Sequence, residues 1–218
     1  MKKIIKYLFL LTGGSFILAS CNDFLDREPL DSVTPDNFFF TENDLAAYAV
    51  KHYNFTTHEG FNAGIWKNDN ATDNQAATDY DKKWIPGQWK VPEAYDNPAS
   101  NDPWYFSAIR EANYFLETVV PRFEKGEIEG SETNIKHYIG EMYFLRAKNY
   151  LSKLETFGDF PIIKNTLPDE SASLIQASKR EPRHKVARFI LEDLDLAIGL
   201  LTNTISGGKN RITQNAAL

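Results

Sequence analysis

The residues best suited to binding chemistry lie in a long irregular stretch, residues 54–101, where tryptophans alternate with short polar side chains. A tryptophan ring packs against the C–H face of a sugar, and amide or carboxylate oxygens accept hydrogen bonds from its hydroxyl groups. This composition predicts a glycan-binding site. Its candidate residues are Trp66, Asp69, Asp73, Asn74, Trp84 and Trp89.

The same tryptophans have a second interpretation, in which they are hydrophobic anchors that hold the stretch against neighbouring helices. Trp104, which falls inside a predicted helix, is expected to belong to the core. An irregular stretch of this length in a compact domain usually carries function or is disordered, and its aromatic content argues against disorder. Binding and anchoring therefore both stay open for Trp84 and Trp89.

Sequence motifs for metal-dependent or nucleophilic catalysis are incomplete. His58-Glu59 begins a zinc-protease pattern, but Asn62 stands where the second histidine is needed. The Asp/Asn run at 69–74 lacks the alternating oxygen ligands and the glycine of an EF-hand, which leaves only a looser calcium site open. The sequence also has no Gly-rich phosphate loop and no serine nucleophile elbow. We therefore assign no catalytic residue, metal ligand or cofactor, and expect a protein that is not an enzyme.

Residues 1–20 have the order of a bacterial secretory signal. Three lysines precede an apolar stretch that is too short to span a membrane, and small residues lead to Cys21, the single cysteine of the chain. This order predicts a lipoprotein signal peptide with lipidation of Cys21. An ordinary signal peptide followed by an incidental cysteine is the alternative. Residues 21–40 are rich in Asp and Pro and are expected to tether the anchor to the folded body.

Charge restricts the partners of the chain. Removal of residues 1–20 takes away three lysines and no acidic residue, which changes the net charge from −6 to −9. An acidic exterior argues against nucleic acid and against electrostatic adhesion to anionic lipid. We therefore expect membrane attachment through the lipid on Cys21 and no nucleic-acid partner.

Helical periodicity predicts four helices and the beginning of a fifth. The first has a capping pattern at Thr41 and Asp44, the second ends at Pro121, and the third ends at Gly158. Thr213 has the position of an N-cap before the last residues of the sequence. The expected spans are residues 41–53, 102–121, 134–157 and 182–201.

The third predicted helix, residues 134–157, carries apolar residues on more than one face. A surface helix has a single stripe about 100° wide, so this helix is expected to be packed on at least two sides. Glu141 and Arg146 lie within its most apolar part, on different faces, and each is expected to pair with another element rather than with the other. The pattern predicts an all-α, tetratricopeptide-like array of stacked helices.

Several segments resemble the SusD/RagB-type outer-membrane nutrient-binding lipoproteins of Bacteroidetes. The strongest are Glu141-Met142-Tyr143-Phe144-Leu145-Arg146-Ala147 and Phe157-Gly158-Asp159-Phe160-Pro161. The segments Cys21-Asn22-Asp23-Phe24-Leu25-Asp26, Lys179-Arg180-Glu181-Pro182-Arg183 and Gly208-Lys209-Asn210-Arg211-Ile212-Thr213 are also similar to parts of the family. The combination is specific, although no single segment is.

The resemblance implies a tetratricopeptide-like helical domain at residues 41–218, in a lipoprotein anchored at Cys21 and exposed on the outer-membrane surface. Family members bind an oligosaccharide, or in some relatives a peptide, and deliver it to a SusC-like TonB-dependent transporter. They are binding proteins rather than enzymes. Because family members are much longer and this sequence stops within a predicted helix, the resemblance also implies an N-terminal fragment.

One departure limits what the resemblance implies. Starch-binding members have closely spaced tryptophans in the irregular stretch, whereas Trp84 and Trp89 are five residues apart here. Ligand residues are therefore not transferred from the family, and starch is not implied. A structural lipoprotein that binds only protein partners is the alternative to glycan uptake, and capture of a peptide is a further one.

Overall fold

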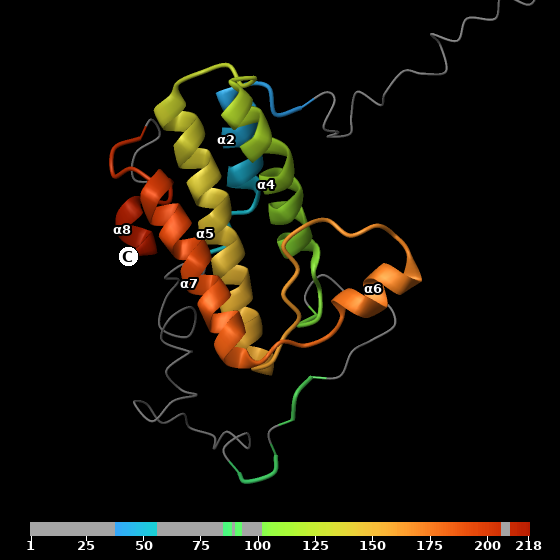
Figure 1. Cartoon of the computed structure of the whole chain (residues 1–218). Helices are drawn as coiled ribbons and strands as arrows, with labels where there is room; N and C mark the ends of the chain where they lie inside the picture. Colours follow the sequence, from blue (N-terminus) through green and yellow to red (C-terminus); the bar gives the residue numbers. More distant parts are fainter. Residues whose placement is uncertain (1–37, 56–84, 89, 93–101, 206–209) are drawn as a thin grey trace, which may run out of the picture. The chain divides into compact units, whose positions relative to one another are not determined.

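The structure is a computed structural model that describes residues 38–55, 85–88, 90–92, 102–205 and 210–218. Within these residues the only β-type pairings are two isolated bridges, Thr41 with Glu129 and Phe160 with Glu181. All named elements are helices, labelled as in Figure 1: α2 (Glu42–Lys51), α4 (Ser107–Lys125), α5 (Glu132–Phe157), α6 (Ser171–Ala177), α7 (Arg183–Leu200) and α8 (Gln214–Ala217).

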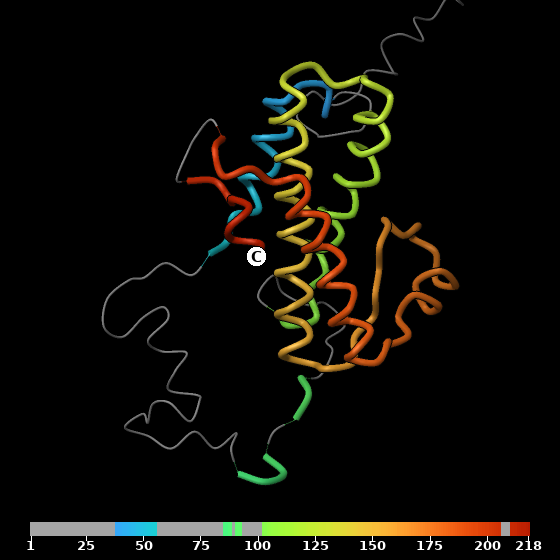
Figure 2. The backbone as a smooth tube through the Cα atoms, turned by 60° about the vertical axis from the view of Figure 1, so that its left-hand side comes forward, coloured from blue at the N-terminus to red at the C-terminus, as the bar shows by residue number. Residues whose placement is uncertain are grey.

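Helix α5 is the common partner of the other long helices. It lies between α4 and α7, with α2 also packed against it (Figures 1 and 2). Every residue from His137 to Met142 is buried. These six consecutive residues span more than one helical turn of 3.6 residues, so the helix is enclosed on all sides there. The predicted two-sided packing and the all-α, tetratricopeptide-like array are confirmed.

Gly140 explains how closely α5 and the end of α7 approach each other. A Cβ atom at Gly140 would lie 3.0 Å from the Leu201 side chain and 3.2 Å from the Leu201 nitrogen. A glycine inside a helix costs about 1 kcal/mol relative to alanine. Here it lets the backbone after α7 lie directly against α5.

The apolar core consists of two clusters arranged along α5. The first contains the N-terminal half of α5 together with α2, α4 from Ala112 onward, the end of α7 and α8. The second contains the C-terminal half of α5 together with Ile109 of α4, the N-terminal half of α7 and Phe160. The two clusters meet near Arg146, which is the point where α4, α5 and α7 are joined by polar side chains.

The beginning of the packed unit follows the predicted capping pattern. The Thr41 hydroxyl accepts a hydrogen bond from the Asp44 backbone, and the Asp44 carboxylate accepts one from the Thr41 N–H at 3.0 Å. Phe39, just before this cap, is completely buried even though its φ is 70°. A left-handed backbone costs a bulky residue about 1–2 kcal/mol. Burial of the Phe39 ring against Tyr48 and Phe115 offsets that cost.

Both predicted ends of the second helix are wrong. Helix α4 begins at Ser107 rather than at Asp102-Pro103, because the Asp102 carboxylate accepts the Trp104 N–H in a local turn instead of capping a helix. It also continues through Pro121 to Lys125. The turn after Pro121 is stabilised by Arg122, which donates to the Phe38 carbonyl at 2.7 Å. Tertiary contacts therefore outweigh the cost of an internal proline.

The remaining elements agree with the predicted order, with one addition. Helix α5 ends at Phe157 and is capped by Gly158, whose φ of 72° explains the glycine. Helix α7 occupies the span of the fourth predicted helix. The short helix α6 lies between the third and fourth predicted helices, where no helix was predicted, and none of its residues is buried. No helix among the described residues is long and apolar enough to cross a membrane.

Candidate functional site

The irregular stretch of residues 54–101, called the Trp-rich stretch from here on, leaves the helical core just after α2. The point at which it leaves, its exit, is held by α5. The Tyr53 hydroxyl donates to Glu141 at 2.7 Å. The next carbonyl, that of Asn54, accepts a hydrogen bond from Lys148 at 2.8 Å. The Lys148 ammonium also lies over the Phe55 ring. The exit of the stretch is therefore anchored on one side of α5.

The Trp-rich stretch returns to the core at Trp104, which confirms the core role predicted for this residue. The Trp104 ring packs against Phe157 and Phe160 in the second cluster. Its indole N–H donates to the carbonyl of Pro92 at 2.8 Å, which attaches a residue of the stretch itself to the core. Lys153 of α5 donates to the carbonyls of Pro103 and Tyr105.

Lys148 and Lys153 attach both ends of the stretch to the same helix. The two lysines are five residues apart on α5, which corresponds to about 7.5 Å along the helix axis and about 140° around it. Partial burial lowers the pKa of both ammonium groups, and Asp102 opposes this shift at Lys153. Both ends of the stretch are therefore fixed on one rigid helix, a common way to position binding residues.

Replacing both Lys148 and Lys153 with alanine is expected to loosen the base of the Trp-rich stretch. Each lost hydrogen bond is worth about 1 kcal/mol, so the double variant is expected to be cleaved at least roughly fivefold faster where cleavage follows the open population. The measurement is the rate of limited proteolysis between residues 54 and 101 in the full-length protein. Lys136→Ala, a change at a surface lysine of the same helix paired with Glu132, is the control. Equal cleavage rates in the double variant and the control would show that these lysines do not hold the stretch.

The residues predicted from sequence to bind glycan lie outside the described part of the chain. This holds for Trp66, Asp69, Asp73, Asn74, Trp84 and Trp89, and also for the predicted lipidation site at Cys21. The structure describes how the ends of the stretch are held, and the roles of these residues stay predictions.

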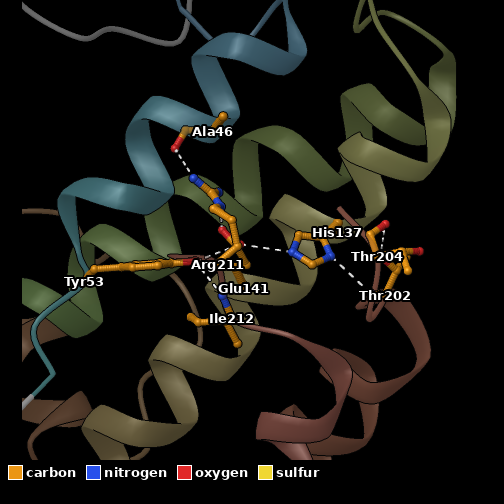
Figure 3. Close-up of polar contacts among 8 residues, drawn as sticks. All are labelled: Ala46, Tyr53, His137, Glu141, Thr202, Thr204, Arg211 and Ile212. Carbon is orange, nitrogen blue, oxygen red and sulfur yellow. Dashed lines mark hydrogen bonds and ion pairs between the residues drawn. The ribbon is translucent and has the colours of Figure 1, made fainter. Parts of the chain in front are cut away.

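A buried polar cluster around Glu141 supports the exit of the stretch (Figure 3). Glu141 is completely buried, and both of its carboxylate oxygens bind Arg211, at 2.8 and 2.5 Å. Tyr53 donates to the same carboxylate, and the Ile212 N–H donates to the Tyr53 hydroxyl at 3.0 Å. The cluster therefore connects α2, α5 and the segment before α8.

Hydrogen bonding determines the tautomer of His137 in this cluster. The Thr202 N–H donates to Nδ1 of His137 at 3.1 Å, so Nδ1 carries no proton (Figure 3). Nε2 lies 3.1 Å from a Glu141 oxygen and is the protonated nitrogen that donates to it. Burial and the nearby Glu141 charge raise the pKa of Tyr53 above its ordinary value, so this hydroxyl stays a donor at neutral pH.

A second buried ion pair connects the long helices at the junction of the two clusters. The guanidinium of Arg146 binds both oxygens of Asp193 on α7, each at 2.7 Å, and donates to Asn113 on α4 at 2.9 Å. Burial raises the pKa of Asp193, and Arg146 opposes that shift. The prediction that Glu141 and Arg146 pair with other elements rather than with each other is confirmed.

The sequence did not reveal the contacts at the base of the stretch. Lys148 and Lys153 look like solvated charges on a helix, and their hydrogen-bond acceptors are backbone carbonyls, which have no sequence signature. The described residues contain no group of three His, Cys, Asp or Glu side chains placed to hold a metal ion.

Comparison with known proteins relates the whole helical body to one family. A SusD-like family model described as "Starch-binding associating with outer membrane" matches residues 23–218. The SusD-like protein P2 of Formosa agariphila is 26% identical over 193 residues, which cover 86% of this chain and 36% of that protein.

Solved structures agree with this match. A SusD-like protein from Bacteroides fragilis superimposes with a TM-score of 0.56 and 25% identity over 88% of this chain. A second Bacteroides fragilis protein, described as a SusD-like carbohydrate binding protein, gives a TM-score of 0.58 over 83% of this chain, and its 18% identity supports the shared fold alone. The chain spans 36% of the length of both structures. From the family match across residues 23–218, this chain belongs to the SusD-like family.

Proposed function

We propose that this chain is part of a surface lipoprotein that binds an oligosaccharide or polysaccharide and delivers it to a SusC-like TonB-dependent transporter. The single observation that carries the proposal is the family match over residues 23–218, whose description names starch binding and association with the outer membrane. The family description gives the general class of ligand, and the identity of the glycan is left to experiment.

The Trp-rich stretch is the proposed glycan-binding region. The anchored ends on α5 support this proposal, because a loop fixed at both ends holds its side chains with less loss of entropy on binding. The proposed binding residues are Trp66, Asp69, Asp73, Asn74, Trp84 and Trp89. Cys21 is proposed to carry the lipid that anchors the protein at the cell surface.

Replacing Trp66, Trp84 or Trp89 with alanine is expected to weaken glycan binding by about tenfold or more, since a buried tryptophan at an interface commonly contributes over 1.4 kcal/mol. The measurement is isothermal titration calorimetry of the full-length protein against a panel of polysaccharides. Phe40→Ala, which removes a partly exposed ring outside the stretch, should leave the affinity unchanged.

Two outcomes separate this proposal from its alternatives. Unchanged glycan affinity in all three tryptophan variants would overturn the assignment of the binding residues. A full-length protein that co-purifies with a transporter but binds no glycan in the panel would overturn glycan capture, and binding of a peptide mixture by the same protein would indicate peptide uptake instead.

A further inference from the structure

A largely apolar cavity lies between the beginning of α4, the extended segment 161–167 and α6, outside the proposed glycan-binding residues. Its volume is about 360 Å³, which is within the range of small-molecule sites. Its apolar lining contains both buried and more exposed side chains: Trp104, Phe106, Ile109, Ile163, Leu167 and Leu174.

The uncharged polar groups of this cavity are mostly bonded within the protein. The Asn113 amide donates to the Ile163 carbonyl at 2.8 Å, and its oxygen accepts from Arg146. The Ser178 hydroxyl donates to the carbonyl of Ile175. A sugar ring needs many free hydrogen-bonding partners for its hydroxyl groups, so the cavity is poorly suited to a neutral sugar.

One arginine lines the cavity and a second lies against one of its lining residues. Arg110 is part of the lining, and the guanidinium of Arg180, which is not, lies 4.9 Å from the centre of the Trp104 ring. Both side chains belong to exposed residues, and within the described ranges no ion pair joins either of them to a carboxylate. In a chain with a net charge of −6, a guanidinium in the lining and a second one beside the Trp104 ring are suited to a carboxylate ligand.

Helix α6 has an apolar side chain that a ligand in this cavity would cover. Leu174 faces the cavity but is 43% exposed, and no residue of α6 is buried. An apolar group in the cavity would remove Leu174 and the Trp104 ring from water, which is favourable in proportion to the area covered. The cavity therefore combines an apolar lining with one arginine, Arg110, and has Arg180 beside its Trp104 wall.

We propose that this cavity binds a small organic acid whose aryl or branched-alkyl body fills the apolar region and whose carboxylate binds Arg110 and Arg180. The ligand is a free acid or the same acid group carried on a larger molecule. This binding site is independent of the proposed glycan-binding residues.

The test uses 3-phenylpropionate as the probe and its neutral amide, 3-phenylpropanamide, as the matched control ligand. Binding to the full-length protein is measured by calorimetry and by ligand-observed NMR. We expect saturable one-to-one binding of the acid, with the amide about tenfold weaker because it loses one charge-assisted interaction. Competition with a peptide that ends in a free carboxylate distinguishes the two sources of the acid group. Displacement of the probe would indicate that the cavity accepts an acid group carried on a larger molecule, and no displacement would indicate that it accepts only a free small acid.

Three variants locate the probe. Arg110→Gln combined with Arg180→Gln should weaken binding of the acid about tenfold and leave the amide unaffected. Leu174→Asp should abolish binding of both ligands, since it places a charge in the apolar region. Arg188→Gln, at an exposed arginine of α7 that does not line the cavity, is the control for loss of an arginine elsewhere on the surface.

Any one of three results would overturn the proposal. The first is a failure of the acid to saturate the protein up to about 10 mM, which corresponds to very weak binding. The second is equal affinity for the acid and the amide, and the third is an equal effect of the paired arginine variant and of Arg188→Gln on binding of the acid. Circular dichroism of each variant checks that the helices are intact.

Discussion

Replacing Glu141 with alanine is expected to lower the free energy of unfolding of the full-length protein by about 3–5 kcal/mol, because it leaves a buried guanidinium without its counter-ion. The Arg211 side chain is only 9% exposed, and both oxygens of Glu141 bind it. The Tyr53 hydroxyl and the His137 ring lose the same acceptor. In a protein of this size such a loss corresponds to a decrease in melting temperature of roughly 10 °C.

The measurement is urea unfolding followed by circular dichroism. Glu155→Ala, at an exposed acidic residue of the same helix, is the control and should change the stability by less than about 0.5 kcal/mol. Glu141→Leu combined with Arg211→Met should recover much of the loss, because an apolar pair of similar volume removes both charges from the core. A Glu141→Ala loss as small as that of Glu155→Ala would contradict the structure of this cluster.

The Glu141 cluster also connects stability with the proposed binding region. Tyr53 is the last residue before the Trp-rich stretch, and its hydroxyl is held between Glu141 and the Ile212 N–H. Arg211 packs over the rings of Tyr53 and Tyr138. Loss of Glu141 therefore releases both the exit of the stretch and residues 210–218 from α5. We expect weaker glycan binding in the same variant, even though Glu141 does not contact the ligand in the proposal.

Replacing Arg146 with alanine is expected to cost about 3–5 kcal/mol, because the carboxylate of Asp193 and the amide oxygen of Asn113 lose their partner in the interior. The Asp193 side chain is 2% exposed, so water cannot replace the guanidinium. Unfolding by urea gives the loss, and Arg188→Ala on the exposed face of α7 is the control. Arg146→Met combined with Asp193→Leu should be more stable than Arg146→Ala alone.

The pH dependence of the Arg146→Ala variant provides a second readout. Burial raises the pKa of Asp193 and Arg146 opposes that shift, so removal of Arg146 raises the pKa further above the unfolded value of about 3.9. A folded state with the higher pKa binds more protons than the unfolded state, so the variant loses stability as the pH rises through that pKa. We expect the deficit relative to wild type to be smaller near pH 5 than at pH 8. A deficit that grows toward acid would exclude a buried, unpaired Asp193 as its cause.

The two ion pairs explain how α5 is fixed against its neighbours. An apolar helix surface alone leaves several rotations and translations of similar energy. Arg146 reaches α4 and α7 together, whereas Glu141 reaches Tyr53, just after α2, and the segment before α8. Each pair satisfies its charges in a single arrangement of these elements. Buried polar groups with this role have been found to favour one packing over others in some proteins.

The sequence by itself determined the elements whose signals are local. The capping pattern at Thr41 and Asp44, the doubly apolar helix that ends at Gly158 and the helix from Arg183 all follow from contacts within a few residues. The same local patterns, read together, indicated the family. The sequence also placed Trp104 in the core and predicted that Glu141 and Arg146 do not pair with each other.

Only the tertiary structure decided the features that depend on residues far apart in the chain. Helix α4 continues past Pro121 because Arg122 contacts the Phe38 carbonyl, and it starts late because the turn at Asp102 places Trp104 against Phe157. Lys148 and Lys153 hold the base of the Trp-rich stretch through backbone carbonyls, which every residue possesses. Their partners are 48–94 positions away, and no local pattern specifies such pairs, because only the packing of the helices brings them within hydrogen-bonding distance.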